Sequence, residues 1–203
     1  MKKIGLMGGS FDPIHIGHLL LAQCAMEEMH LDEVWFIPTG YSYMKKDRNV
    51  TASDKRLQMT ELAVRDRQKM YCLDIEVKRE GYTYSYETLE VLAAKYPEYT
   101  FYFIFGADCL FTVESWKHPE RLFSNAHIVA AFRNGASTED MLEKADELTR
   151  KYDAKITLLP FWNLEISSTE IRKRIKEGKS IDFLVPDEVI SYIKQEGLYQ
   201  NEN

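Results

Sequence analysis

Two histidines near the start of the chain have the spacing and the surroundings to act on a phosphoryl group. His15 and His18 lie three positions apart, so a helix that begins near Ile14 places both on one face of its first turn. Protonated, or as neutral N–H donors, they can stabilise the charge that develops during phosphoryl transfer. Helix-capping or core histidines are the structural alternative. A zinc site is less well supported, because no third ligand lies nearby in the sequence.

The residues before the histidines suit the same chemistry. Gly8 and Gly9 follow an expected strand and precede an expected helix. Glycine lets the backbone approach a ligand closely, and a helix N-terminus offers free N–H groups to an anion. The pattern is neither GxGxxG nor a P-loop, because the glycines fall elsewhere and no GK[ST] follows. We therefore predict a glycine-rich phosphate-binding loop of another type.

A second candidate anion site lies near the C-terminus. Ser167 and Glu170 have capping-box spacing, which explains these two residues structurally. It leaves Ser168, Thr169 and Arg172 unexplained. Hydroxyl groups at a helix N-terminus, followed one turn later by a guanidinium, are suited to bind phosphate. A solvated basic helix face is the alternative.

The elements that must position these residues alternate along the chain. Apolar runs predict strands at 3–7, 33–37, 73–77, 100–105, 127–132 and 155–159, whereas helical patterns cover 16–29, 53–67, 85–96, 137–152, 167–178 and 186–196. This alternation predicts an α/β, doubly wound, mainly parallel sheet with helices on both faces. Without repeats or linker-like composition, residues 1–203 are expected to form one domain, whose C-terminal helical segment 167–199 carries the second anion site.

Composition narrows the class of protein. The 203 residues are 45% hydrophobic and carry a formal net charge of −6, which provides one sizeable core and argues against a nucleic-acid partner. Cys24, Cys72 and Cys109 are too scattered to suggest a zinc site or a disulfide framework. We find no signal peptide and no apolar stretch long enough to cross a bilayer. A cytoplasmic protein without a membrane partner is expected.

At this point a family resemblance becomes visible. The sequence from Gly8 to Pro13, GGSFDP, followed by HIGH at 15–18, resembles the signature of the nucleotidyltransferases with an (H/T)xGH motif. Residues 166–175 contain a segment similar to the SSTxIR sequence of that superfamily. The resemblance implies a Rossmann-like fold, histidines that contact the triphosphate of ATP, and no covalent enzyme intermediate. The ATP-binding residues it implies are Gly8, Gly9, Ser10, Phe11, His15, His18, Gly106, Asp108, Ser168, Thr169 and Arg172.

Other segments resemble one family within that superfamily, the nicotinate-nucleotide adenylyltransferases. Gly106-Ala107-Asp108 resembles a GAD turn in which the aspartate contacts a ribose. Trp116 occupies the position of a tryptophan that stacks on the pyridine ring, and backbone amides at positions matching Ser85 and Lys117 receive the pyridine carboxylate. A helix-capping role for Asp108 and a core role for Trp116 are the structural alternatives.

The resemblance has departures. Residues 79–89 are similar to the family's REGxSYTxDTL segment, with Ser85 in place of threonine and Glu87 in place of aspartate. The family's PPHK loop aligns with 42–45, where Met44 stands at the usual histidine position and Lys45 remains as an expected phosphate contact. The nicotinate nucleotide site implied by the resemblance comprises Ser10, Lys45, Ser85, Trp116 and Lys117.

The reaction implied is adenylyl transfer from ATP to nicotinate mononucleotide, which gives nicotinate adenine dinucleotide and pyrophosphate. The acceptor phosphate attacks the α-phosphorus in line and needs no strong base. Catalysis then consists of positioning and charge neutralisation by His15, His18, Lys45 and Arg172. Mg²⁺ is expected on the phosphate oxygens, with no dedicated protein ligands.

The sequence leaves three alternative functions open. The acceptor could be nicotinamide mononucleotide, because backbone contacts distinguish the two pyridines poorly. It could be another nucleotidyl acceptor such as phosphopantetheine, although that group typically lacks the combination of motifs found here. A non-catalytic nucleotide-binding module is the third, and the intact histidine pair weighs against it. A homo-oligomer is compatible with the sequence.

Overall fold

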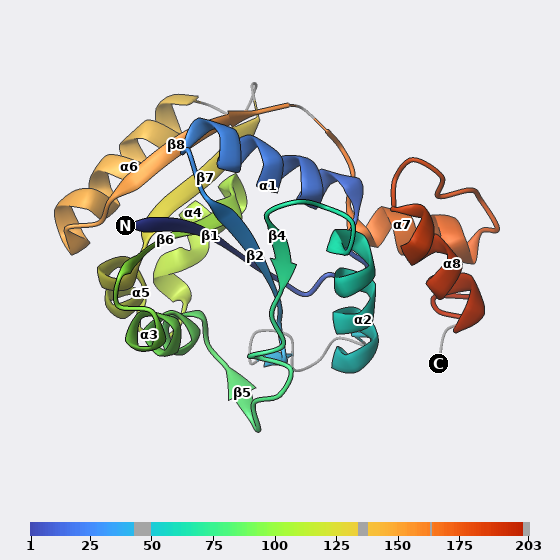
Figure 1. The fold of residues 1–203 in the computed structure, drawn as a ribbon. Helices are drawn as coiled ribbons and strands as arrows, with labels where there is room; N and C mark the ends of the chain where they lie inside the picture. The colour runs from blue at the N-terminus through green and yellow to red at the C-terminus, as the bar shows by residue number, and fades with distance from the viewer. Residues whose placement is uncertain (43–49, 134–137, 163, 201–203) are drawn as a thin grey trace.

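A parallel six-stranded sheet forms the centre of the molecule (Figure 1). The computed structural model describes residues 1–42, 50–133, 138–162 and 164–200. The sheet strands are β1 (Lys2–Gly9), β2 (Glu33–Pro38), β4 (Met70–Cys72), β6 (Tyr99–Gly106), β7 (His127–Arg133) and β8 (Ile156–Phe161), in the order β4-β2-β1-β6-β7-β8. Every neighbouring pair in this sheet is parallel. The predicted parallel sheet is confirmed.

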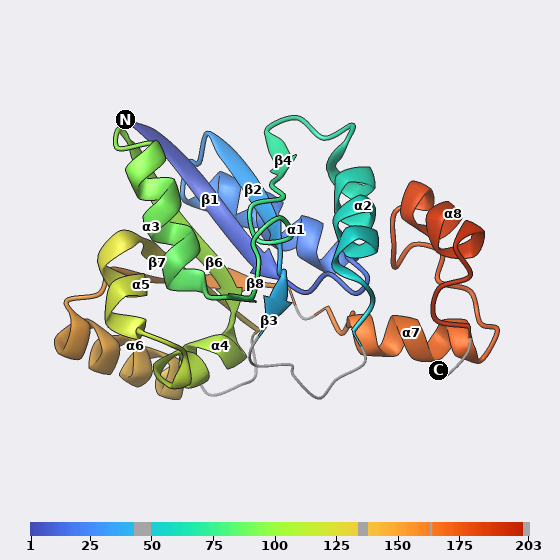
Figure 2. The same cartoon turned by 90° about the horizontal axis from the view of Figure 1, so that it is seen from below.

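Helices connect the strands and cover both faces. They are α1 (Ile16–Glu28), α2 (Ser53–Val64), α3 (Ser85–Lys95), α4 (Ala107–Thr112), the short 3₁₀ helix η2 (Val113–Ser115), α5 (Pro119–Asn125), α6 (Thr138–Tyr152), α7 (Ser168–Lys176) and α8 (Asp187–Gln195). Buried side chains of α1, α2, α7 and α8 pack on one face, and those of α3 to α6 on the other. Figures 1 and 2 show α7 and α8 beyond α2, away from α3, α5 and α6.

Strand β6 contributes buried side chains to the hydrophobic clusters on both faces of the sheet. Phe101, Phe103 and Phe105 are buried in the cluster under α3 and α5, whereas Tyr102 and Ile104 are buried in the cluster under α1 and α2. Successive side chains of a strand point to opposite faces, so a strand covered on both sides is apolar throughout. The continuous aromatic run at 100–105 was a correct indicator of a central strand.

The strand order places a ligand crevice at the end of β1. From β1 the chain proceeds outward through β2 and β4 on one side, and then returns to add β6, β7 and β8 on the other. This is the order of the dinucleotide-binding Rossmann fold, in which ligands bind beyond the carboxyl ends of the strands where the winding direction reverses. Gly8 and Gly9, the last residues of β1, lie at that point.

One predicted strand is wrong, and several short elements were not predicted. Residues 73–77 alternate in polarity, but the sheet strand ends at Cys72 and the chain then turns. Local backbone bonds form that turn, from Lys78 N–H to the Asp74 carbonyl at 2.9 Å and from Arg79 N–H to the Glu76 carbonyl at 3.2 Å. The unpredicted elements are α4, η2, α5 and the parallel pair of β3 (Tyr41–Ser42) with β5 (Tyr82–Thr83).

Candidate functional site

The two histidines meet at the start of α1, though not as two positions of one helical turn. The helix begins at Ile16, so His15 is the N-cap residue and only His18 is inside the helix. Their rings stack with centroids 3.7 Å apart, and the His15 backbone N–H donates to His18 Nδ1 at 3.2 Å. The expected proximity is confirmed, but it arises because the extended N-cap backbone folds His15 over His18.

Both imidazoles are held neutral. Burial lowers the pKa of His15 to about 4, and burial together with the nearby His15 lowers the pKa of His18 well below its ordinary value. Because His18 Nδ1 accepts a hydrogen bond, the neutral ring carries its proton on Nε2. His15 Nδ1 is buried and has no hydrogen-bond partner within the described part of the chain. The pair is therefore suited to act through neutral N–H donors.

Gly17, between the two histidines, is required by packing. A Cβ atom at this position would lie 3.1 Å from His15 Nδ1 and 3.2 Å from His15 Cε1. A larger residue would therefore press on the imidazole, which would have to shift slightly to make room. The glycine of the HIGH sequence thus preserves the stacked geometry of the two rings.

The predicted glycine-rich loop is in fact the end of a strand. Gly8 and Gly9 belong to β1 and pair with Ile37 and Pro38 of β2. Both glycines keep their sheet pairing, so β1 continues up to the crevice. The Phe11 side chain, only 2% exposed, packs edge-on against His18 with ring centroids 5.1 Å apart. The Phe11 ring thus helps to hold the His18 imidazole in position.

The two motifs predicted from opposite ends of the chain form one site. Arg172 Nη1 donates to the backbone carbonyl of Asp12 at 2.7 Å, and Ser168 Oγ donates to the carbonyl of Pro13 at 2.9 Å. These bonds join segments separated by 160 and 155 positions. The N-terminus of α7 therefore lies against the GGSFDP segment, beside the histidine pair.

The local structure of α7 matches its sequence pattern. Ser167 is the N-cap residue, and its side chain accepts a hydrogen bond from the Glu170 N–H at 3.2 Å. The exposed Thr169 hydroxyl accepts a bond from Arg172 Nη2 at 3.4 Å. Capping explains Ser167, while the remaining hydroxyls and the guanidinium are arranged around the helix N-terminus, where N–H groups attract an anion.

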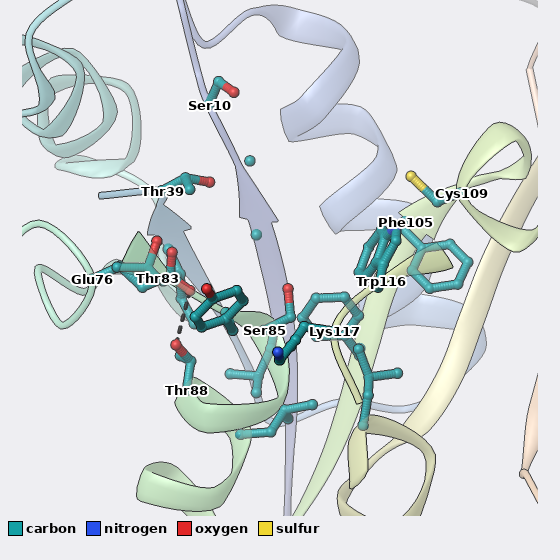
Figure 3. A pocket seen from close by; sticks show the side chains of 18 residues that line it. Ser10, Thr39, Glu76, Thr83, Ser85, Thr88, Phe105, Cys109, Trp116 and Lys117 are labelled. Carbon is teal, nitrogen blue, oxygen red and sulfur yellow. Dashed lines mark hydrogen bonds between the residues drawn. The ribbon is translucent and has the colours of Figure 1, made fainter. Parts of the chain in front are cut away.

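A cavity of about 380 Å³ opens beside the end of β1 (Figure 3). Figure 3 shows Phe105 and Trp116 on one side of this cavity and Glu76, Thr83 and Thr88 on the other. Of the predicted acceptor residues, the lining includes Ser10, Ser85, Trp116 and Lys117, and of the predicted ATP-binding residues Gly8, Gly9 and Ser10. His15 and His18 are not among the lining residues. The cavity is connected to them through Ser10, which lines it, and the next residue Phe11, which packs against His18.

The cavity walls combine an aromatic plane with a helix N-terminus. The indole of Trp116 contacts the edges of Phe103 and Phe105 at centroid distances of 6.4 and 6.1 Å. Its Nε1 is buried without a hydrogen-bond partner in the described ranges. Ser85 is the first residue of α3, so its backbone N–H is among those not used inside the helix. Such a site suits a planar ring that carries an anionic group.

Of the remaining predicted residues, the structure describes Gly106 and Asp108 but not Lys45. Gly106 ends β6 and is the N-cap of α4, without a side-chain cap bond. Asp108 is exposed in the first turn of α4; because Gly106 is the N-cap and no side chain caps this helix, Asp108 does not have the capping role given as its structural alternative. The prediction for Lys45, and the substitution at Met44, lie outside the described residues.

Sequence reasoning missed a buried arginine behind the site. Arg56 of α2 is only 3% exposed, and its guanidinium and Nε donate to four backbone carbonyls. The acceptors are Thr51 at 2.8 Å, Ser10 at 2.7 Å, Thr39 at 2.7 Å and Gly40 at 3.3 Å. Arg56 therefore joins the ends of β1 and β2. A helical arginine ordinarily indicates a solvated surface, and no local signal distinguishes this one.

A buried carboxyl group in the cavity wall was also missed. Glu76 is 7% exposed and accepts a hydrogen bond from Thr88 Oγ1 at 2.9 Å. Burial raises its pKa, since the charged form loses its hydration. A Cβ atom at Gly40 would lie 2.2 Å from the Glu76 carbonyl oxygen, so the glycine permits this close approach. The residue was assigned to a strand, and for that reason its role in the wall was not anticipated.

Comparison with known proteins agrees with this geometry. Residues 6–174 match the cytidylyltransferase-like family, and the chain belongs to that family. It is 45% identical to the probable nicotinate-nucleotide adenylyltransferase of Lachnoclostridium phytofermentans, over 98% of this chain and 100% of the relative. It is 41% identical to that of Desulfitobacterium hafniense, over 98% and 96%. Within the family, the chain therefore belongs to the nicotinate-nucleotide adenylyltransferases.

Solved structures give the same assignment. The nicotinic acid mononucleotide adenylyltransferase of Plasmodium falciparum complexed with NaAD superposes with a TM-score of 0.79 at 25% identity. The match covers 100% of this chain and 99% of that one. The same enzyme complexed with APC gives a TM-score of 0.76. The Rossmann-like fold expected from the sequence is thus confirmed.

Proposed function

We propose that this chain transfers the adenylyl group of ATP to nicotinate mononucleotide, giving nicotinate adenine dinucleotide and pyrophosphate. The observation that carries the proposal is the bond from Arg172 to Asp12. It brings the N-terminus of α7 to the histidine pair, next to a cavity with one aromatic wall. An anion site for a triphosphate and a pocket for a planar acceptor are therefore adjacent. The full-length similarity to nicotinate-nucleotide adenylyltransferases supports the same reaction.

The donor side stabilises charge and does not supply a base. In the transfer, an oxygen of the acceptor phosphate forms a bond to the α-phosphorus, and the bond from that phosphorus to the bridging oxygen breaks. Pyrophosphate leaves with the electron pair. His18 is suited to donate its Nε2–H to a phosphate oxygen, and Arg172 with the α7 N-terminus offers further donors to the departing group. Fixed donors in a partly buried site stabilise this charge without reorganising.

Lys45 and the other predicted contacts belong to the same proposal. Lys45 would neutralise charge on a phosphate. Gly8 and Gly9 at the carboxyl end of β1, with Ser10 directly after them, would approach ATP through the backbone. Asp108 and Gly106 at the end of β6 would contact the ribose side. The exposed position of Asp108 in the first turn of α4 leaves its carboxylate accessible for such a contact.

Mg²⁺ is expected to enter this site bound to the phosphates of ATP. Among the described residues, no three histidine, cysteine, aspartate or glutamate side chains come together as a ligand set. We expect the ion to be held by phosphate oxygens and water, as magnesium often is. When bound, it would neutralise charge on the phosphates.

The acceptor side favours a pyridine with a negative substituent. The free N–H groups at the start of α3 attract an anion through hydrogen bonding and the helix dipole. Trp116 offers a ring face for stacking. Nicotinamide mononucleotide, with an uncharged amide, is the second candidate acceptor because backbone N–H groups can also donate to an amide oxygen.

Measurement of pyrophosphate release tests the proposal. Purified protein is supplied with ATP, Mg²⁺ and, in separate reactions, nicotinate mononucleotide, nicotinamide mononucleotide or phosphopantetheine. Nicotinate mononucleotide should give the highest kcat/KM. A preference for the amide would change the acceptor, and release with none of the three would favour a nucleotide-binding module. No helix in the described part of the chain is long and apolar enough to span a membrane.

We also propose that the whole chain acts as one unit. The α7–α8 segment buries Ile171, Val189 and Ile193 in the same cluster as α1 and α2. Removing that segment would expose this cluster and remove Arg172 from the site.

A further inference from the structure

The last described turn of the chain returns to the phosphate site. Helix α8 ends at Gln195, and the Leu198 N–H bonds to the Ile193 carbonyl at 3.0 Å, as in a helix C-terminal motif closed by glycine. Gly197 and Tyr199 both have positive φ, 61° and 65°. The chain therefore reverses, and Tyr199 points back toward the N-terminal half of the molecule.

The Tyr199 hydroxyl reaches Asp12 within the GGSFDP segment. It donates to Asp12 Oδ1 at 2.7 Å, across 187 positions of sequence. Burial and the Asp12 carboxylate raise the pKa of Tyr199, so the hydroxyl remains protonated and acts as the donor. A bond to a carboxylate is among the stronger hydrogen bonds in proteins.

Asp12 is the point at which three segments meet. It is 5% exposed. Its Oδ1 accepts the bond from Tyr199, its Oδ2 accepts one from the Thr51 N–H at 3.3 Å, and its backbone carbonyl accepts one from Arg172 at 2.7 Å. The side-chain bonds fix the position of the residue, and that position sets the carbonyl against which the Arg172 guanidinium is oriented. Displacement of Asp12 would therefore displace Arg172.

We propose that Tyr199 is a positioning residue for ATP, which acts through Asp12 to hold Arg172 beside the histidine pair. The identity of the ligand rests on the proposed function. Tyr199 itself touches no reacting atom. Its effect is expected on the donor side, because the lining of the acceptor cavity includes neither Tyr199 nor Asp12 nor Arg172.

The test compares Tyr199→Phe with Tyr192→Phe. The first removes only the hydroxyl and keeps the ring that packs against the core. The second removes a hydroxyl from α8, at a tyrosine whose ring packs against the same cluster.

Affinity for a non-hydrolysable ATP analogue is measured by calorimetry, together with kcat, both KM values and Tm. Tyr199→Phe should weaken analogue binding and lower kcat/KM for ATP by about tenfold. The acceptor KM should not change, and Tyr192→Phe should match the wild type.

Asp12→Asn and the double variant sharpen the test. If the two residues act through one bond, the double variant should lose no more ATP affinity than the more impaired single variant. Additive losses would overturn the proposal. So would unchanged analogue binding in Tyr199→Phe with a lowered Tm, which indicates a structural role alone, or a selective rise in acceptor KM. Analogue binding without pyrophosphate release in the wild type would refute the proposed function, while the effect of Tyr199 would still be judged from the binding constants.

Discussion

The donor and acceptor sides of the site are built in different ways. On the donor side, polar bonds join residues far apart in sequence, such as Arg172 with Asp12 and Ser168 with Pro13. On the acceptor side, aromatic packing of Trp116 on Phe103 and Phe105 forms a wall from one stretch of chain around β6. Phosphates are recognised by fixed donors, which several segments must aim at one point. A planar ring is recognised by shape, which one packed wall can supply.

Loss of Arg56 should break both sides together. Its guanidinium bonds Ser10 on the donor side and Thr39 and Gly40 beside the cavity. Arg56→Met would leave buried carbonyls without donors, and we expect a loss of about 4 kcal/mol in the free energy of unfolding. Urea denaturation measures this. Arg67→Met is the matched control, because Arg67 is exposed and its side chain bonds one carbonyl, that of Ala63 in the preceding helix, so the stability of this variant should remain near that of the wild type.

The buried histidines should make the donor side acid-sensitive. The folded pKa of His15, about 4, lies below its unfolded value of about 6.5. Between these values the unfolded chain binds more protons, so the stability from His15 is complete above pH 6.5 and is lost as the pH falls toward 4. Wild type should lose about 3 kcal/mol more than His15→Gln across this window. Parallel stability curves for the two proteins would contradict a neutral buried His15.

His18→Ala should affect the donor side alone. Removing one preorganised donor to a developing phosphate charge is expected to lower kcat about a hundredfold. The fold and the KM for nicotinate mononucleotide should not change, because the cavity lining does not include His18. Steady-state kinetics with a circular dichroism spectrum of each protein provides the measurement. Near-normal kcat in a folded variant would refute the catalytic role of His18.

Trp116→Ala should affect the acceptor side alone. Loss of a stacking face is expected to raise the KM for nicotinate mononucleotide about tenfold, with little change in the KM for ATP. Trp116→Phe keeps an aromatic ring and should recover part of the loss. If the acceptor KM is unchanged in both variants, Trp116 is only a packing residue.

The two sides also differed in how far they could be predicted. Ser168, Thr169 and Arg172 were selected from their types and spacing, and the structure brings Ser168 and Arg172 to the GGSFDP segment as expected. Glu76 was assigned to a strand because its neighbours alternate in polarity. Glu76 instead lies in a turn, where its carboxyl group is buried against Thr88. Local periodicity does not distinguish these cases, since the burial of Glu76 depends on a partner twelve positions away.

The strand–helix alternation, the parallel sheet and the motifs that indicate nucleotidyl transfer could all be predicted from the amino-acid sequence. These depend on short-range patterns: apolar runs for buried strands, HIGH for the histidine pair, and a capping serine before α7. Three features became apparent only from the tertiary structure. His15 is an N-cap residue stacked on His18, Arg56 connects two strand ends by hydrogen bonds, and Tyr199 donates a hydrogen bond to Asp12. Each of these depends on a hydrogen-bond or packing partner whose position is set by the chain fold, because folding alone decides which buried polar groups can be satisfied together.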